Sequence, residues 1–227
     1  MYICKEFIFH SDYGLLKYEG NYTAIALITM TLSKITTGQK IAFWTIVLVI
    51  IDQVVKLLVN ANMDVGEKIS VFPWFDLCYV ENPGFAFGMQ LAETDGGIDW
   101  GKIVLSLFRI VMIGAIIYGI RHLLRKRPDT PKGVIVGAVL ILAGAIGNMV
   151  DSMFYGLFIE CQDGGFLTGK VIDMIHLPLF KWDNPPAVFD FLVGSDGYFF
   201  GAVFNVADAY ISVAVVYLLI FHYKFFK

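Results

Sequence analysis

The chain has 227 residues, of which 57% are hydrophobic and only 16% are charged, whereas about a quarter of the residues in a soluble domain carry charge. This composition excludes an ordinary soluble domain and indicates a protein embedded in lipid. The net charge of -3 gives no reason to expect a nucleic-acid partner. The histidines and cysteines show no metal-ligand spacing, so we expect neither a metal nor a cofactor, and one bridge between Cys78 and Cys161 remains open.

Four apolar segments are long enough to cross a bilayer. They cover residues 41–59, 103–120, 134–150 and 202–221; roughly 20 residues at ~1.5 Å each match a ~30 Å hydrocarbon core. We therefore predict an all-α integral membrane protein with four transmembrane helices. The membrane domain is expected to span residues 38–227, after an unstructured extension, 1–37, in which Met30 is an alternative start.

Basic residues predict the orientation of these helices. The short loop RHLLRKRPDTPK, residues 121–132, is rich in Arg and Lys, whereas the connections 61–100 and 152–201 are acidic. The positive-inside rule then places both termini and the basic loop in the cytoplasm. In the first outer connection, ISVFPWFDLCYV alternates like short strands before the turn-rich ENPGFAFG. The second is an extended segment rich in Gly, Pro and aromatic residues.

Ionisable residues inside the predicted spans need a partner or a function, because a charge in a lipid environment is costly. Asp52 and Lys56 are four residues apart, so they share one helix face. They are either a self-neutralising pair or a support for an active site. The motifs GAIGNMVDS and FNVADAYIS each place an Asn three residues before an Asp. These side chains either cross-link helices through hydrogen bonds or line a polar pocket.

The depth of the acids favours a pocket. Asp208 is expected ~9 Å and Asp52 ~10 Å below the outer surface, and Asp151 lies at the outer end of the third span. Two close carboxyl groups in such a pocket cannot both ionise cheaply, so one stays protonated while the other acts as a base. That arrangement can activate water and protonate a departing amide nitrogen.

Two other classes of function would use intramembrane polar residues. A small proton-coupled transporter is the main alternative, but it predicts acids through the full depth of the membrane and matching halves. A scaffold that binds membrane partners would explain the two Asn residues. Neither class calls for several acids in one layer beneath the outer surface.

Five motifs in order resemble the lipoprotein signal peptidase (signal peptidase II) family. They are DQVVK at 52–56, ENPGFAFG at 81–88, GAIGNMVDS at 144–152, GKVIDMI at 169–175 and FNVAD at 204–208. The resemblance implies an aspartic endopeptidase of the bacterial inner membrane with its active site facing the periplasm. It also implies cleavage of prolipoproteins before a cysteine that carries a diacylglyceryl group, contact with membrane lipids, and inhibition by globomycin.

The resemblance also implies roles for individual residues. The catalytic pair falls on Asp173 and Asp208. Positions that shape or support the site fall on Asp52, Lys56, Asn82, Gly84, Gly144, Asn148, Asp151 and Asn205.

This chain departs from the family pattern at two places. Many members have Arg directly after the Asp of GNxxD, where this chain has Ser152, so its local charge balance must be set differently. The segment between the third and fourth spans is also long, and its VFDFL stretch makes Asp190 an alternative to Asp173. From the residues alone, Asp173 is not preferred over Asp151.

Overall fold

The computed structural model describes residues 36–83, 100–162, 164–184, 186, 193 and 197–227. The expected amino-terminal extension, Gly84 and the rest of its motif, and Asp190 therefore lie outside the described residues. Contacts divide the chain into residues 1–41 and 42–227. The arrangement below concerns the second unit.

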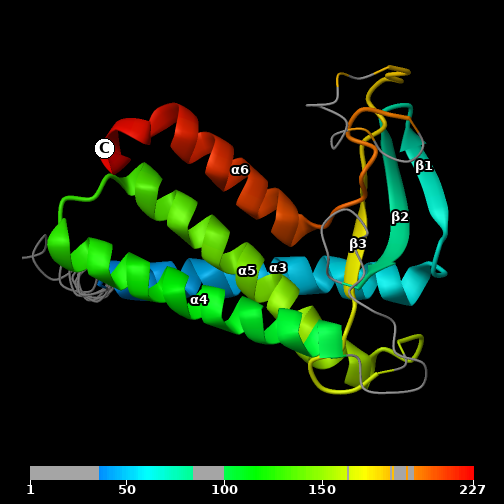
Figure 1. The fold of residues 1–227 in the computed structure, drawn as a ribbon, viewed down its shortest axis with the longest axis horizontal. Helices are drawn as coiled ribbons and strands as arrows, with labels where there is room; N and C mark the ends of the chain where they lie inside the picture. Colours follow the sequence, from blue (N-terminus) through cyan, green and yellow to red (C-terminus); the bar gives the residue numbers. More distant parts are fainter. Residues whose placement is uncertain (1–35, 84–99, 163, 185, 187–192, 194–196) are drawn as a thin grey trace, which may run out of the picture. The chain divides into compact units, whose positions relative to one another are not determined.

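Among the described residues, three helices are long and apolar enough to cross a membrane, and they coincide with the first three predicted spans. They are α3 (Thr37–Asn62), α4 (Trp100–Lys126) and α5 (Lys132–Phe158), and each extends beyond the predicted span. A shorter apolar helix, α6 (Val206–Phe221), comes fourth and is followed by the 3-10 turn η3 (Tyr223–Phe226). α3 and α5 run towards the strands, and α4 and α6 run away from them (Figure 1).

The predicted start of the fourth helix at residue 202 is wrong. Phe204 is in extended backbone: its N–H donates to the Ile175 carbonyl, and the Ile175 N–H donates to the Phe204 carbonyl. Asn205 then caps the helix, because its side chain accepts a hydrogen bond from the Asp208 N–H. The capping places Asp208 in the first helical turn, not six residues into a span.

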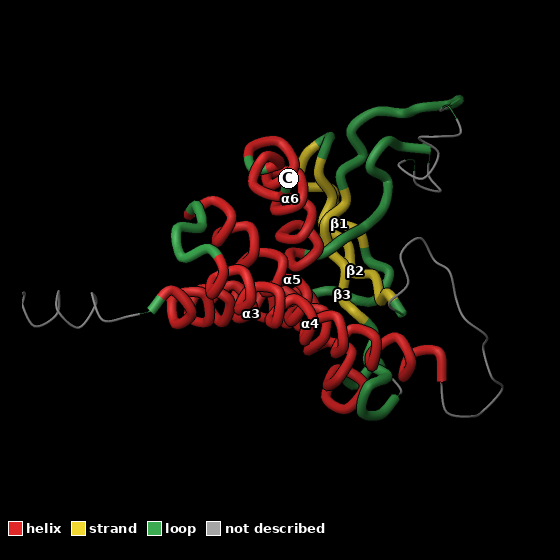
Figure 2. Tube along the Cα trace, turned by 60° about the vertical axis from the view of Figure 1, so that its left-hand side comes forward, coloured by secondary structure: helices red, strands yellow, loops and turns green. Residues whose placement is uncertain are grey.

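A small antiparallel sheet lies at one end of the helices. The expected strands in the first connection form β1 (Lys68–Phe72) and β2 (Phe75–Asn82), and the sheet order is β1-β2-β3. The third strand, β3 (Val171–His176), comes from the second connection and was not predicted. Figure 2 shows the three strands gathered beside the helix ends. The sheet thus joins two segments that lie far apart in the sequence.

A polar cluster ties the three strands together. The Asp76 carboxylate accepts hydrogen bonds from the Ser70 hydroxyl at 2.7 Å and from the Lys68 ammonium at 2.8 Å, and it lies 2.8 Å from Nδ1 of His176. The hydrogen bond with Lys68 is the main reason why the pKa of Asp76 falls to about 2. Each strand therefore contributes a side chain to one ionic cluster.

The apolar core lies where α3 and α5 end against β2 and β3. It contains Val59, Met63, Tyr79, Tyr155, Ile159, Ile172 and Met174. The outward helix faces are also apolar: Val111 is 67% exposed and Val213 is 60% exposed. Such faces suit contact with lipid. Cys78 is buried and Cys161 is exposed as free thiols, so the bridge between them that we left open does not form.

Candidate active site

Asp173 lies in β3 among neutral hydrogen-bond donors. The Asn82 amide donates to Oδ2 at 2.9 Å, and the Asn205 amide donates to Oδ1 at 2.6 Å. The side chain is almost fully buried, with 2% of Asp173 exposed. Burial raises the pKa of Asp173 to about 7, and the charge of Asp208 acts in the same direction. Near neutral pH this carboxyl group can therefore keep its proton.

Asp208 faces the same Asn205 from the first turn of α6. Asn205 accepts a hydrogen bond from the Asp208 backbone N–H at 2.9 Å while its amide binds the Asp173 carboxylate, so one side chain contacts both residues. Asn148 of α5 donates to Oδ1 of Asp208 at 2.7 Å. The two acids are thus fixed by neutral amides from β2, α5 and the start of α6.

A buried ionic layer, formed by Asp52, Lys56 and Asp151, lies next to this pair. Lys56 is within 2.9 Å of Asp52 and 2.6 Å of Asp151, and none of these three side chains is exposed. Lys56 also donates to the Asn148 side-chain oxygen at 3.0 Å. The expected pair of Asp52 and Lys56 therefore forms, and Asp151 joins it. The ionic layer therefore contacts Asn148, which is the residue that positions Asp208.

Gln53 connects this layer internally, and sequence reasoning missed it. Its amide donates to Asp151 at 2.8 Å, to Asp52 at 3.1 Å and to the Gly147 carbonyl at 3.2 Å, and its oxygen accepts from the Tyr155 hydroxyl at 3.0 Å. A signal was available, because Gln53 is a polar residue in a predicted span next to Asp52.

Close approach of three helices brings these groups together. Asp52 of α3 accepts a hydrogen bond from the Ala207 N–H at the start of α6, at 2.9 Å. A Cβ atom on Gly147 would lie 2.6 Å from an Asp52 carboxylate oxygen, and one on Gly144 would clash with the Ala207 carbonyl. Only glycine at these two positions leaves room for α3 and α6 against α5.

Arg109 brings a cation from α4 that sequence reasoning did not single out. Its guanidinium donates to the Ser152 hydroxyl, which in turn donates to the Asn148 carbonyl at 3.0 Å. Arg109 is also within electrostatic range of Asp151, Asp208 and Asp173. A positive charge therefore reaches the site although residue 152 is serine. Its signal was an arginine inside the second predicted span.

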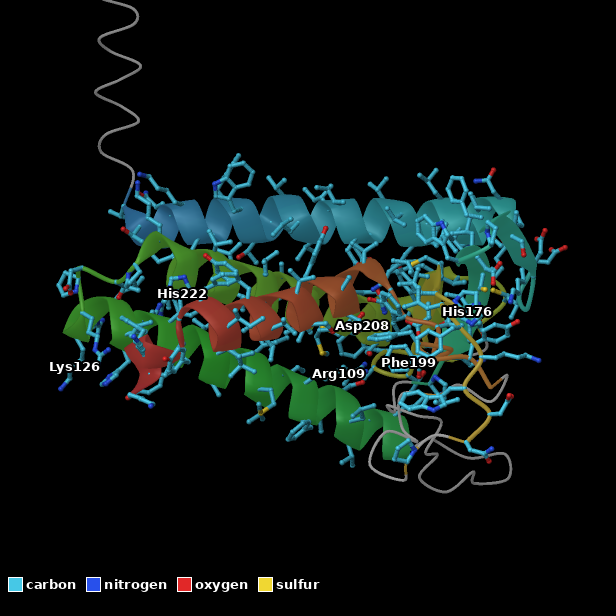
Figure 3. All side chains as sticks on the ribbon, turned by 90° about the horizontal axis from the view of Figure 1, so that it is seen from above. Arg109, Lys126, His176, Phe199, Asp208 and His222 are labelled. Atoms are coloured by element: carbon cyan, nitrogen blue, oxygen red, sulfur yellow. The ribbon has the colours of Figure 1, made fainter. Side chains whose placement is uncertain are left out.

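Hydrogen bonds and ion pairs join most of the sequence-predicted site residues into one network. Its members are Asp173, Asn82, Asn205, Asp208, Asn148, Lys56, Asp52 and Asp151. Gly144 contributes only space, and Gly84 is not among the described residues. Arg109 and Asp208 lie towards the His176 end, and Lys126 and His222 lie at the other end (Figure 3). Within the described part of the chain, no group of three or more His, Cys, Asp or Glu side chains could hold a metal ion.

The chain is similar to known proteins along most of its length. A family model described as Signal peptidase (SPase) II matches residues 44–224. A lipoprotein signal peptidase of Porphyromonas gingivalis is 38% identical over 202 residues, which cover 83% of this chain and 85% of the relative. One of Amoebophilus asiaticus is 36% identical over 181 residues, covering 76% and 72%.

Two solved structures share the fold. Each is described as a bacterial membrane enzyme structure obtained by the in meso method, one at 2.3 Å and one at 1.9 Å resolution, and both give a TM-score of 0.54. Their identities are 22% and 23%, and the matches cover 80% and 82% of this chain and 85% and 93% of theirs.

Proposed function

Since the chain belongs to the signal peptidase II family, and is therefore an aspartic peptidase that cleaves signal peptides from prolipoproteins, we propose that Asp173 and Asp208 are its catalytic pair. The observation that carries the assignment is the difference between two kinds of acid in the site. Asp52 and Asp151 are ion-paired with Lys56, whereas the contacts described above for Asp173 and Asp208 come from neutral amides.

This difference decides which acids can move protons. A carboxylate held by a buried ammonium stays ionised and would lose that ion pair on protonation. Asp173 and Asp208 instead interact electrostatically with each other, and the Asn205 side chain contacts the carboxylate of Asp173 and the backbone N–H of Asp208. Such a pair holds one proton between two groups. Asp173 is therefore favoured over Asp151, which the residues alone did not distinguish.

The reaction follows from that protonation state. The ionised member of the pair takes a proton from water, whose oxygen attacks the scissile carbonyl carbon. The protonated member donates its proton to the amide nitrogen as the C–N bond breaks. The pKa of about 7 for Asp173 suits it for the acid role, and leaves Asp208 as the base.

The substrate we propose is a prolipoprotein cleaved on the amino-terminal side of a cysteine that carries a diacylglyceryl group. The site is supported by helices whose outer faces are apolar, so acyl chains can stay in the bilayer while the scissile bond reaches the acids. On this view a precursor without the lipid is cut very poorly. Globomycin is expected to occupy the same site and to inhibit the enzyme.

We also propose that the enzyme sits in the inner membrane with the acid pair near the periplasmic face. The basic end with Lys126 is then cytoplasmic, as are both termini, and the site lies towards the other end (Figure 3). α6 is the fourth span in this topology although it has only 16 residues, which at ~1.5 Å each cover ~24 Å.

One experiment tests the catalytic assignment. Asp173→Asn and Asp208→Asn each keep the size of the side chain but remove the titrating group, so turnover of a lipid-modified precursor should fall at least ~100-fold. Asp64→Asn, at an exposed acid beyond α3, is the matched control and should keep full turnover. Near-normal turnover by Asp173→Asn, with loss in Asp190→Asn, would assign the second acid to residue 190.

A further inference from the structure

Arg109 is a charged residue inside a membrane-spanning helix, six residues after the predicted outer end of the span at Ile103. The segment from Ile103 to Ile120 is otherwise apolar apart from Ser106 and small residues. An arginine at such a position is costly unless it has a partner or a task. It reaches the Ser152 hydroxyl on the neighbouring helix α5, so its charge lies inside the helix bundle.

The charges around the acid pair show what that cation can do. Asp52, Asp151, Asp173 and Asp208 are held close together, and the ammonium inside their network is Lys56. With one proton shared by Asp173 and Asp208, the acids still outnumber this cation. A further carboxylate charge would be repelled, so the pair needs another nearby cation to remain half ionised. Arg109 is in electrostatic range of both members.

The contacts of Arg109 also reach the residue that binds Asp208. Ser152 has one hydroxyl proton, which it donates to the Asn148 carbonyl, and its lone pair accepts from the guanidinium. Asn148 in turn donates to Asp208 at 2.7 Å. Arg109 on α4 is therefore anchored, through Ser152, to the backbone of the same α5 residue whose side chain binds the acid in α6.

We propose that Arg109 is a positioning residue of the peptidase, whose guanidinium, anchored on Ser152, supplies from α4 the positive charge that lets the Asp173–Asp208 pair keep a single proton. This proposal rests on the catalytic pair proposed above. It explains how the chain functions with serine at position 152, because the residue after Asp151 serves as an anchor for an arginine from another helix. It also assigns a task to α4, which provides none of the acids.

The test is the pH profile of kcat/KM on a lipid-modified precursor. In Arg109→Gln, kcat/KM near neutral pH should fall about tenfold, and both limbs of the profile should move to higher pH by about one pH unit, since a nearby cation favours the ionised acids. Arg109→Lys keeps the charge and should leave the limbs in place. Arg121→Gln removes the same charge from an exposed position on the same helix and should change neither rate nor profile.

A swap of positions provides the rescue. Ser152 is the residue that Arg109 contacts, so Arg109→Gln combined with Ser152→Arg places a guanidinium in the same region from α5. This double variant should restore the limbs to their original pH and recover most of the rate. Ser152→Ala removes only the anchor, and it should shift the limbs in the same direction by less, which keeps the test informative if Arg109→Gln fails to fold.

Two results would overturn the proposal. Unmoved limbs in Arg109→Gln, with or without a lower rate, would show that the arginine serves packing alone. Equal losses in Arg109→Lys and Arg109→Gln at unchanged pH would show the same. Failure of the catalytic pair looks different: Asp173→Asn or Asp208→Asn would then stay active, whereas failure of this proposal alone leaves both of those variants inactive.

Discussion

Removing the ammonium of Lys56 should destabilise the protein strongly. Lys56 is fully buried, pairs with Asp52 and Asp151 at 2.9 and 2.6 Å, and donates to Asn148 at 3.0 Å. Breaking a buried ion pair by removing one partner costs roughly 3–5 kcal/mol, because the other charge is left uncompensated. Lys56→Met strands two carboxylates, so we expect a loss of about 4 kcal/mol or more in the free energy of unfolding.

Thermal unfolding in detergent micelles measures this loss. For a protein of this size, 1 kcal/mol corresponds to roughly 2–4 °C, so Tm should fall by about 10 °C. Lys126→Met, at an exposed lysine near the end of α4, is the matched control and should unfold like the parent.

A double variant tests the same reasoning more sharply, through the sign of its change in stability relative to Lys56→Met. In Lys56→Met with Asp151→Asn, one stranded carboxylate becomes a neutral amide, while Asp52 keeps hydrogen bonds from Gln53 and the Ala207 N–H. The double variant should therefore be more stable than Lys56→Met alone. A double variant that is equally or less stable would refute the idea that uncompensated charge causes the loss.

Two further predictions concern space and protonation. Gly147→Ala should lower both Tm and turnover, because the new methyl group would lie 2.6 Å from an Asp52 oxygen. Gly114→Ala is the control: its new methyl group would have nothing within 4 Å, so this variant should be as stable as the parent or slightly more stable. The pKa of Asp173 is about 7 in the folded protein, against an ordinary value of 3.8. Between these pH values the folded protein holds a proton that the unfolded chain releases. The stability that this proton contributes therefore falls as pH rises from about 4 to about 7. At roughly 1.4 kcal/mol per pH unit, the stability of Asp173→Asn relative to the parent should therefore improve by up to about 4 kcal/mol between pH 4 and pH 8; equal differences in Tm at the two pH values would contradict this.

The parts of the fold that rest on local patterns could be predicted from the sequence. Hydropathy located α3, α4 and α5 because each is a continuous apolar run. Alternation of apolar and polar residues located the short strands β1 and β2. Asp52, Lys56 and Asp208 were found because they are ionisable residues inside predicted spans. Such residues are costly in lipid, so each one indicates a partner or a function without knowledge of its neighbours.

The parts that depend on distant partners could not be predicted. β3 pairs with β2, almost 100 residues earlier, and with Phe204 after it. Without those partners, GKVIDMI has no pattern that separates Asp173 from other acids outside the spans. The start of α6 was missed for the same reason, because apolar Phe204 continues the hydropathy of the helix although its backbone is bonded to Ile175.

The hydrogen bond between Asp52 and the first turn of α6 sets an order of events during synthesis. α3 leaves the ribosome early and carries Asp52 and Lys56 on one face, so each can neutralise the other when the helix enters the membrane. Asp151 arrives with α5, and the Ala207 N–H arrives 155 residues after Asp52. Asp52 and Asp151 therefore meet the first turn of α6, which carries Asp208, only when this last helix is inserted. On the proposed assignment of Asp173 and Asp208, a nascent chain therefore cannot hydrolyse peptides until α6 has been made and inserted.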